Sequence, residues 1–289
     1  MYAYADQNFL SACVDTPAWS DAVVRARKQG TATLVLSPWH FYEVGNARPE
    51  VRAGMIRLVE DIRPMWTYTM ADLQLLEVFS DWNSFWGRPT AFQPIGTLAE
   101  VGGALHNIHP NYLALATLKD WVDVFAADNR ADIENTLDFV CKSHAENQRS
   151  FKRGRMTKDV LKRMDQMHVA IQLARSEHNG EAKEAMRRAE GILAQEPSAT
   201  HVRFFVDFGG MVSLKSYHVE SALAEDLWAS TAKLKTRYVD RQHATVALPY
   251  CNRFITDDTD LTKRCAVAKR SLTFPTAEVQ NGEEFIKSL

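Results

Sequence analysis

The sequence of 289 residues predicts an α/β fold with a central parallel sheet, on two observations. Short apolar runs alternate with amphipathic segments at both ends of the chain, which is typical of parallel strands joined by crossover helices. Between these parts, from residue 81 to residue 197, strand-like runs are missing and helical patterns dominate. We therefore expect a discontinuous core, formed by residues 1–80 and 198–289, with an all-helical insertion at 81–197.

The N-terminal part illustrates how the elements are assigned. Ala32–Leu36 (ATLVL) is a continuous apolar run, as expected of a strand covered on both faces. Gly30 can adopt a positive φ and end the preceding helix, and Ser37-Pro38 can start the next one. The expected order is strand Tyr2–Ala5, helices Phe9–Val14 and Trp19–Lys28, strand Ala32–Leu36, helices Trp39–Val44 and Val51–Ile62, strand Met65–Thr69 and helix Ala71–Phe79.

The rest of the chain is assigned in the same way. The middle part is expected to contain helices at Asn111–Ala126, Ala131–Ala145, Lys158–Ser176 and Gly180–Gln195. After Pro197 we expect a strand at His201–Phe208, helices at Glu220–Arg237 and Asp240–Leu248, strands at Arg253–Thr256, Ser271–Phe274 and Ala277–Val279, and a helix at Glu283–Ser288.

Composition excludes several classes of protein. With 34 Lys and Arg against 36 Asp and Glu, the chain cannot coat nucleic acid by bulk positive charge, although a local basic patch remains possible. No apolar run approaches the roughly 18–20 residues that a membrane helix needs, and Asp6 interrupts any signal-peptide core at the N-terminus. The four cysteines form no CxxC pair, so we expect free thiols and a cytoplasmic location.

Acidic residues follow the predicted strands. Asp6 ends the first strand, Glu43 lies in the helix after the second, Asp240 opens a late helix, and Asp257 and Asp258 end the last core strand. An Asp after a strand is commonly only a turn residue or a helix N-cap. As a set, however, these acids can converge, because ligands bind outside the carboxyl ends of parallel strands. A carboxylate cluster without His or Cys ligands suits Mg²⁺ or Mn²⁺, and two such ions can activate water for phosphodiester hydrolysis.

Four segments resemble the motifs of PIN-domain nucleases, the fold of many RNA-cleaving enzymes and of VapC-type toxins. Tyr4–Phe9 (YADQNF) resembles the opening hh-D-S/T-N-h, with Gln7 in place of Ser or Thr. Leu36–Val44 resembles the strand-then-Glu element. Asp240–Ala244 (DRQHA) resembles D-x-x-h-A, and Phe254–Leu261 (FITDDTDL) resembles hh-T-x-D-x-D-h. The resemblance extends over the two core parts and not over the insertion.

The resemblance implies a PIN-like three-layer α/β/α core and a set of site residues. The implied catalytic metal ligands are Asp6, Glu43, Asp240 and Asp258, with Asp260 in support. Residues implied to hold these ligands in place are Asn8, Thr256, His243 and Asp257. The fourth ligand can be Asp257 or Asp258, and the T-x-D spacing favours Asp258.

Other histidines and one further aspartate are candidates for a role near these metal ligands. His243 lies on the same helix face as Asp240 and can orient it or contact a scissile phosphate, or it can be an ordinary half-buried histidine. His106 and His109 lack a third ligand at zinc spacing. Asp207, before two glycines, rivals Asp240 as the third ligand.

One segment of the predicted insertion is strongly basic. Arg149–Arg163 carries a net charge of +6 in a chain whose net charge is −2, and it contains Phe151, which can stack on a base. A solvated helix start explains the pattern equally well. The residues expected to bind nucleic acid are Arg149, Lys152, Arg153, Arg155 and Lys158.

These observations together predict a metal-dependent endoribonuclease whose water nucleophile leaves a 3′-hydroxyl and a 5′-phosphate. RNA is the expected substrate, with DNA an alternative. A homodimer and an inhibitory protein partner are both compatible with the sequence, and no membrane association is expected. The alternatives are a non-catalytic PIN-like interaction protein, in which Asp6→Asn would change nothing, and a small-molecule phosphatase, which would not need the basic segment.

Overall fold

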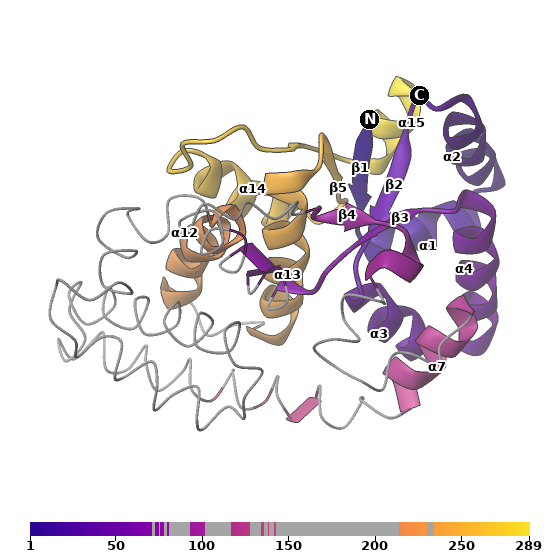
Figure 1. The fold of residues 1–289 in the computed structure, drawn as a ribbon, viewed down its shortest axis with the longest axis horizontal. Helices are drawn as coiled ribbons and strands as arrows, with labels where there is room; N and C mark the ends of the chain where they lie inside the picture. The colour runs from indigo at the N-terminus through magenta and orange to yellow at the C-terminus, as the bar shows by residue number, and fades with distance from the viewer. Residues whose placement is uncertain are drawn as a thin grey trace, which may run out of the picture.

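The structure is a computed structural model that describes residues 1–70, 93–101, 117–127, 214–229 and 234–289, with single positions at 73–80 and 134–142. Within this part of the chain it forms a six-stranded sheet in the order β4-β3-β2-β1-β5-β6 (Figure 1). The strands are β1 (Tyr2–Ala5), β2 (Thr33–Leu36), β3 (Met65–Thr67), β4 (Ile95–Gly96), β5 (Arg253–Ile255) and β6 (Glu278–Gln280).

Five strands are parallel and the edge strand β4 is antiparallel to β3. The first strand is central, paired with β2 on one side and β5 on the other. Its residues Ala3, Tyr4 and Ala5 have no solvent-exposed surface, as expected for a parallel strand covered on both faces. The α/β class is therefore confirmed, and the expectation of a purely parallel sheet is corrected to a mixed one.

Helices lie on both sides of this sheet (Figure 1). On one side are α1 (Gln7–Asp15), α2 (Pro17–Gln29), α3 (Trp39–Asn46), α4 (Pro49–Ile62) and α7 (Leu118–Ala127). On the other are α12 (Lys215–Ala229), α13 (Leu234–Tyr250) and α14 (Thr259–Lys269), while the short α15 (Gly282–Ser288) contacts α2. Gly30, at φ 71°, ends α2 as its sequence context predicts.

Several expected elements are wrong or incomplete. The region 81–197 is expected to hold no strand, yet it supplies β4 to the sheet. The expected helix at 111–126 is present over the described residues as α7, which packs on α3. Asp240 lies inside α13 and does not open a helix. Ser271–Phe274 is not a strand, and α14 was not predicted. The expected helices at 158–176 and 180–195 and the strand at 201–208 lie outside the described residues.

Among the described helices, none combines the length and the apolar composition required to cross a lipid bilayer.

Candidate metal centre

A cavity of about 280 Å³ opens where the central parallel strands end. Its wall contains the four carboxylates that the sequence singles out: Asp6, Glu43, Asp240 and Asp258. The remaining lining residues are Gln7, Asn8, Tyr42, Val239, His243 and Leu261. Acids from four separate segments therefore face one space, as expected for the ligand crevice of a parallel sheet.

Asp6 follows β1 directly and caps α1. Its Oδ1 accepts a hydrogen bond from Phe9 N at 2.9 Å, and the Thr256 hydroxyl donates to the same carboxylate. Only 5% of Asp6 is exposed. Burial raises its pKa to about 6, against the lowering effect of these hydrogen bonds. A cation in the cavity would favour the ionised carboxylate.

Thr256, at the end of β5, connects two of the acids. Besides donating to Asp6, its Oγ1 accepts a hydrogen bond from Asp258 N at 3.2 Å. Asp258 in turn caps α14 by accepting from Leu261 N at 2.8 Å. The threonine thus fixes the spacing between these carboxylates, which is the kind of positioning contact that the resemblance implies.

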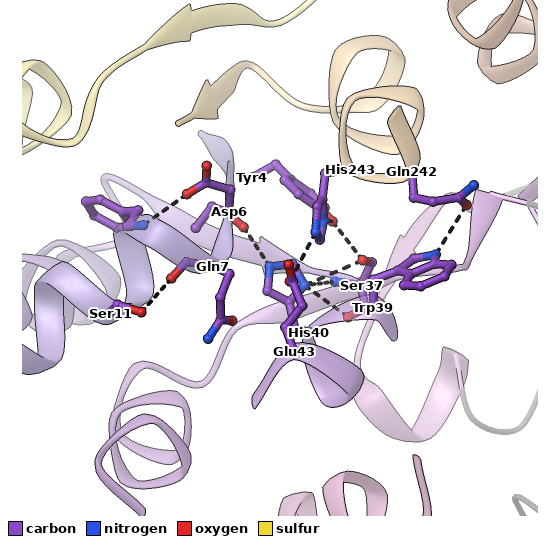
Figure 2. A network of polar contacts seen from close by, with 12 residues as sticks. Tyr4, Asp6, Gln7, Ser11, Ser37, Trp39, His40, Glu43, Gln242 and His243 are labelled. Atoms are coloured by element: carbon purple, nitrogen blue, oxygen red, sulfur yellow. Dashed lines mark hydrogen bonds and ion pairs between the residues drawn. The ribbon is translucent and has the colours of Figure 1, made fainter. Parts of the chain in front are cut away.

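Glu43 forms an ion pair with His243 (Figure 2). Its Oε2 lies 3.1 Å from His243 Nε2. Burial alone would raise the pKa of Glu43, but the charge and the hydrogen bond of His243 outweigh burial and lower it. Burial likewise opposes protonation of His243, yet the carboxylates of Glu43 and Asp6 raise the histidine pKa above its usual value. Of the partners open to His243, its described hydrogen bonds join it to Glu43 and Tyr4 and not to Asp240.

Asp240 is held by a buried arginine. Arg264 of α14, whose side chain is 5% exposed, donates from one guanidinium nitrogen to Asp240 Oδ2 at 2.7 Å. Burial raises the pKa of Asp240 while Arg264 lowers it, and the net shift is upward. The arginine neutralises part of the negative charge that four converging carboxylates create.

The neighbouring acids do not line the cavity. Asp257 accepts a hydrogen bond from Gly282 N at 3.0 Å, at the start of α15. Asp260, 55% exposed, pairs with Arg264 at 3.3 Å and with Arg237 at 3.6 Å. Asp258 therefore lines the cavity, whereas Asp257 and Asp260 do not.

Asn8 is exposed and lines the cavity without a hydrogen bond to Asp6 among those described. The basic residues Arg149, Lys152, Arg153, Arg155 and Lys158 lie outside the described residues, as do His106, His109 and Asp207.

A buried polar chain behind the cavity was not predicted. The Tyr4 hydroxyl lies 2.7 Å from both Ser37 Oγ and His243 Nδ1. His40 Nε2 donates to the Ala5 carbonyl at 2.8 Å, and Ser37 N donates to His40 Nδ1 at 3.0 Å (Figure 2). The spacing His40-x-x-Glu43 on one helix face is the one signal in the sequence for this cluster.

Among the described residues, His40, Glu43 and His243 offer metal-ligating atoms that lie within 4.8 Å of one another. Burial lowers the pKa of His40 to about 4, with a further lowering from His243. His40 is therefore neutral, and both of its nitrogens are occupied by main-chain groups. The donors that face the cavity are four carboxylates and one imidazole, a set that fits a divalent cation.

Comparisons of this chain with protein-family models, curated proteins and solved structures found no match.

Proposed function

We propose that this protein is a metal-dependent endoribonuclease of the PIN type. The observation that carries the proposal is the convergence of Asp6, Glu43, Asp240 and Asp258 on one cavity at the carboxyl ends of the central strands. Close carboxylates repel one another, and burial raises the pKa of Asp6 and Asp240. Such a cluster is costly unless it binds a cation.

The four carboxylates would hold one or two Mg²⁺ or Mn²⁺ ions. When bound, such an ion generates a nucleophilic water and neutralises charge on a phosphodiester. The chain's own contributions are positional: Thr256 holds Asp6 and Asp258, and Arg264 holds Asp240. Attack by water in line with the leaving oxygen leaves a 3′-hydroxyl and a 5′-phosphate.

RNA is the proposed substrate because the four motifs resemble those of RNA-cleaving PIN-domain nucleases. A catalytic pocket of this charge also needs a separate positive surface to hold a polyanion. The basic segment Arg149–Arg163 of the sequence can provide that surface. A small phosphate ester would not require it, so neutralising Lys152, Arg153 and Arg155 distinguishes the nuclease from the phosphatase.

The test compares three proteins on labelled single-stranded RNA and DNA, with Mn²⁺ or with EDTA. The proteins are the wild type, Asp6→Asn, and the matched control Asp21→Asn, which alters an exposed aspartate on α2. We expect the wild type and Asp21→Asn to cleave RNA in Mn²⁺ only, and Asp6→Asn to lose cleavage at least a hundredfold. Equal cleavage by Asp6→Asn, or cleavage in EDTA, would refute the proposal.

A further inference from the structure

The cavity contains an aromatic nitrogen donor that the carboxylate pattern does not require. Among the described residues that line it, His243 is the only one with an imidazole. The side chain is 3% exposed, and its Nε2 is directed at Glu43, a member of the acid set (Figure 2).

Resting on the proposed function, we infer that His243 Nε2 is itself a metal ligand beside Glu43, so that the site selects a transition ion such as Mn²⁺ over Mg²⁺.

The spacing of the two donors supports this assignment. Two ligand atoms bound at right angles to one ion, each about 2.1 Å from it, lie about 3 Å apart. The distance from His243 Nε2 to Glu43 Oε2 is 3.1 Å. The same separation suits a hydrogen bond, and an ion that replaces the shared proton would lie beside the line that joins the two atoms.

The opposite side of the ring is fixed as metal-binding histidines require. His243 Nδ1 lies 2.7 Å from the Tyr4 hydroxyl, and that hydroxyl lies 2.7 Å from Ser37 Oγ. If Nδ1 donates to Tyr4 and Tyr4 donates to Ser37, the lone pair of Nε2 faces the cavity. A hydrogen bond on the second nitrogen that sets the tautomer and the ring orientation accompanies almost every histidine ligand.

His40 is a second buried histidine nearby, and its contacts differ from those of a metal ligand. Its ring centroid lies 5.0 Å from that of His243, but both of its nitrogens bond to the main chain, at Ala5 and Ser37. It also does not line the carboxylate cavity. His40 therefore packs against the ligand and does not bind the ion.

A nitrogen ligand has a consequence for metal choice. Mg²⁺ strongly prefers oxygen donors and keeps much of its water, whereas divalent transition ions accept imidazole, Mn²⁺ less strongly than the ions later in the row. Replacing His243 with an oxygen donor should weaken Mn²⁺ binding and leave Mg²⁺ binding nearly unchanged.

The experiment is pulsed electron paramagnetic resonance of the full-length protein loaded with Mn²⁺, with metal affinities measured in parallel. The proteins are the wild type, His243→Gln, Asp6→Asn and the control His218→Gln, which alters a half-buried histidine on α12 outside the cavity. We expect a ¹⁴N coupling from a directly bound imidazole in the wild type and in His218→Gln, and none in His243→Gln. In His243→Gln the ratio of Mn²⁺ to Mg²⁺ affinity should fall at least tenfold.

Wild-type protein that binds Mn²⁺ in an Asp6-dependent manner without ¹⁴N coupling would overturn the inference and leave the proposed function standing. An absence of Asp6-dependent Mn²⁺ binding would overturn both. Because a wild-type spectrum without ¹⁴N coupling overturns the inference by itself, the refutation does not depend on His243→Gln folding.

Discussion

Removing the charge of Asp6 should stabilise the metal-free protein. Burial raises the pKa of this carboxyl from 3.8 to about 6, so the folded state binds its proton more tightly than the unfolded chain does. A shift of about 2 pKa units corresponds to about 3 kcal/mol at roughly 1.4 kcal/mol per unit. The contribution of Asp6 to stability is therefore fully present below about pH 4 and is lost as the pH rises through about 6.

The variant Asp6→Asn cannot ionise and avoids this loss. Its Oδ1 can still accept from Phe9 N, and the opposing effects of the Phe9 and Thr256 hydrogen bonds on the carboxylate are already contained in the net pKa shift. In EDTA at pH 7.5 we expect Asp6→Asn to be more stable than the wild type by about 3 kcal/mol. Near pH 4 the advantage should disappear.

Urea unfolding in EDTA, followed by circular dichroism at both pH values, measures this difference. Adding Mn²⁺ should then stabilise the wild type and leave Asp6→Asn unchanged, because only the wild type keeps the full ligand set. Asp6→Asn that is less stable than the wild type at pH 7.5, by an amount independent of pH, would refute the reasoning.

Three further changes test separate parts of the site. Asp258→Asn should lower Mn²⁺ affinity at least tenfold by isothermal titration calorimetry, while Asp260→Asn, outside the cavity, should change it less than threefold; equal effects would contradict the placement. Arg264→Gln breaks a buried ion pair and should reduce the free energy of unfolding in EDTA by about 3 kcal/mol; a change below about 0.5 kcal/mol would show that the pair is unimportant. Neutralising Lys152, Arg153 and Arg155 together should reduce the slope of log RNA affinity against log salt concentration by about 2. An unchanged slope would show that RNA does not contact these three residues.

The sequence predicts those strands that are visible as continuous apolar runs. Ala32–Leu36 is such a run, and the structure has β2 there. β4 could not be predicted in this way, because Ile95–Gly96 is only two residues long and is a strand through its pairing with β3. The start of α13 was also missed, since no glycine or proline near Asp240 marks where the helix begins.

Part of the candidate site could likewise be predicted from the sequence, and part of it could not. The convergence of Asp6, Glu43 and Asp258 could be anticipated, because topology brings the carboxyl ends of parallel strands together. Asp240 reaches the same cavity from the interior of α13, which that rule does not predict. The chain from Ser37 through Tyr4 to His243 could not, because its hydrogen bonds join residues up to 239 positions apart. Arg264 is four residues from Asp260, a visible pattern, but its shorter contact is with Asp240 across two helices.

In the proposed function the carboxylate cavity directs water onto a phosphodiester of RNA. The most direct measurement is mass spectrometry of the products formed from a defined RNA oligonucleotide by the wild-type protein in Mn²⁺. We expect fragments with 5′-phosphate and 3′-hydroxyl ends that are absent in EDTA. Fragments ending in a 2′,3′-cyclic phosphate and formed equally in EDTA would contradict it, because they would show attack by the RNA's own 2′-hydroxyl.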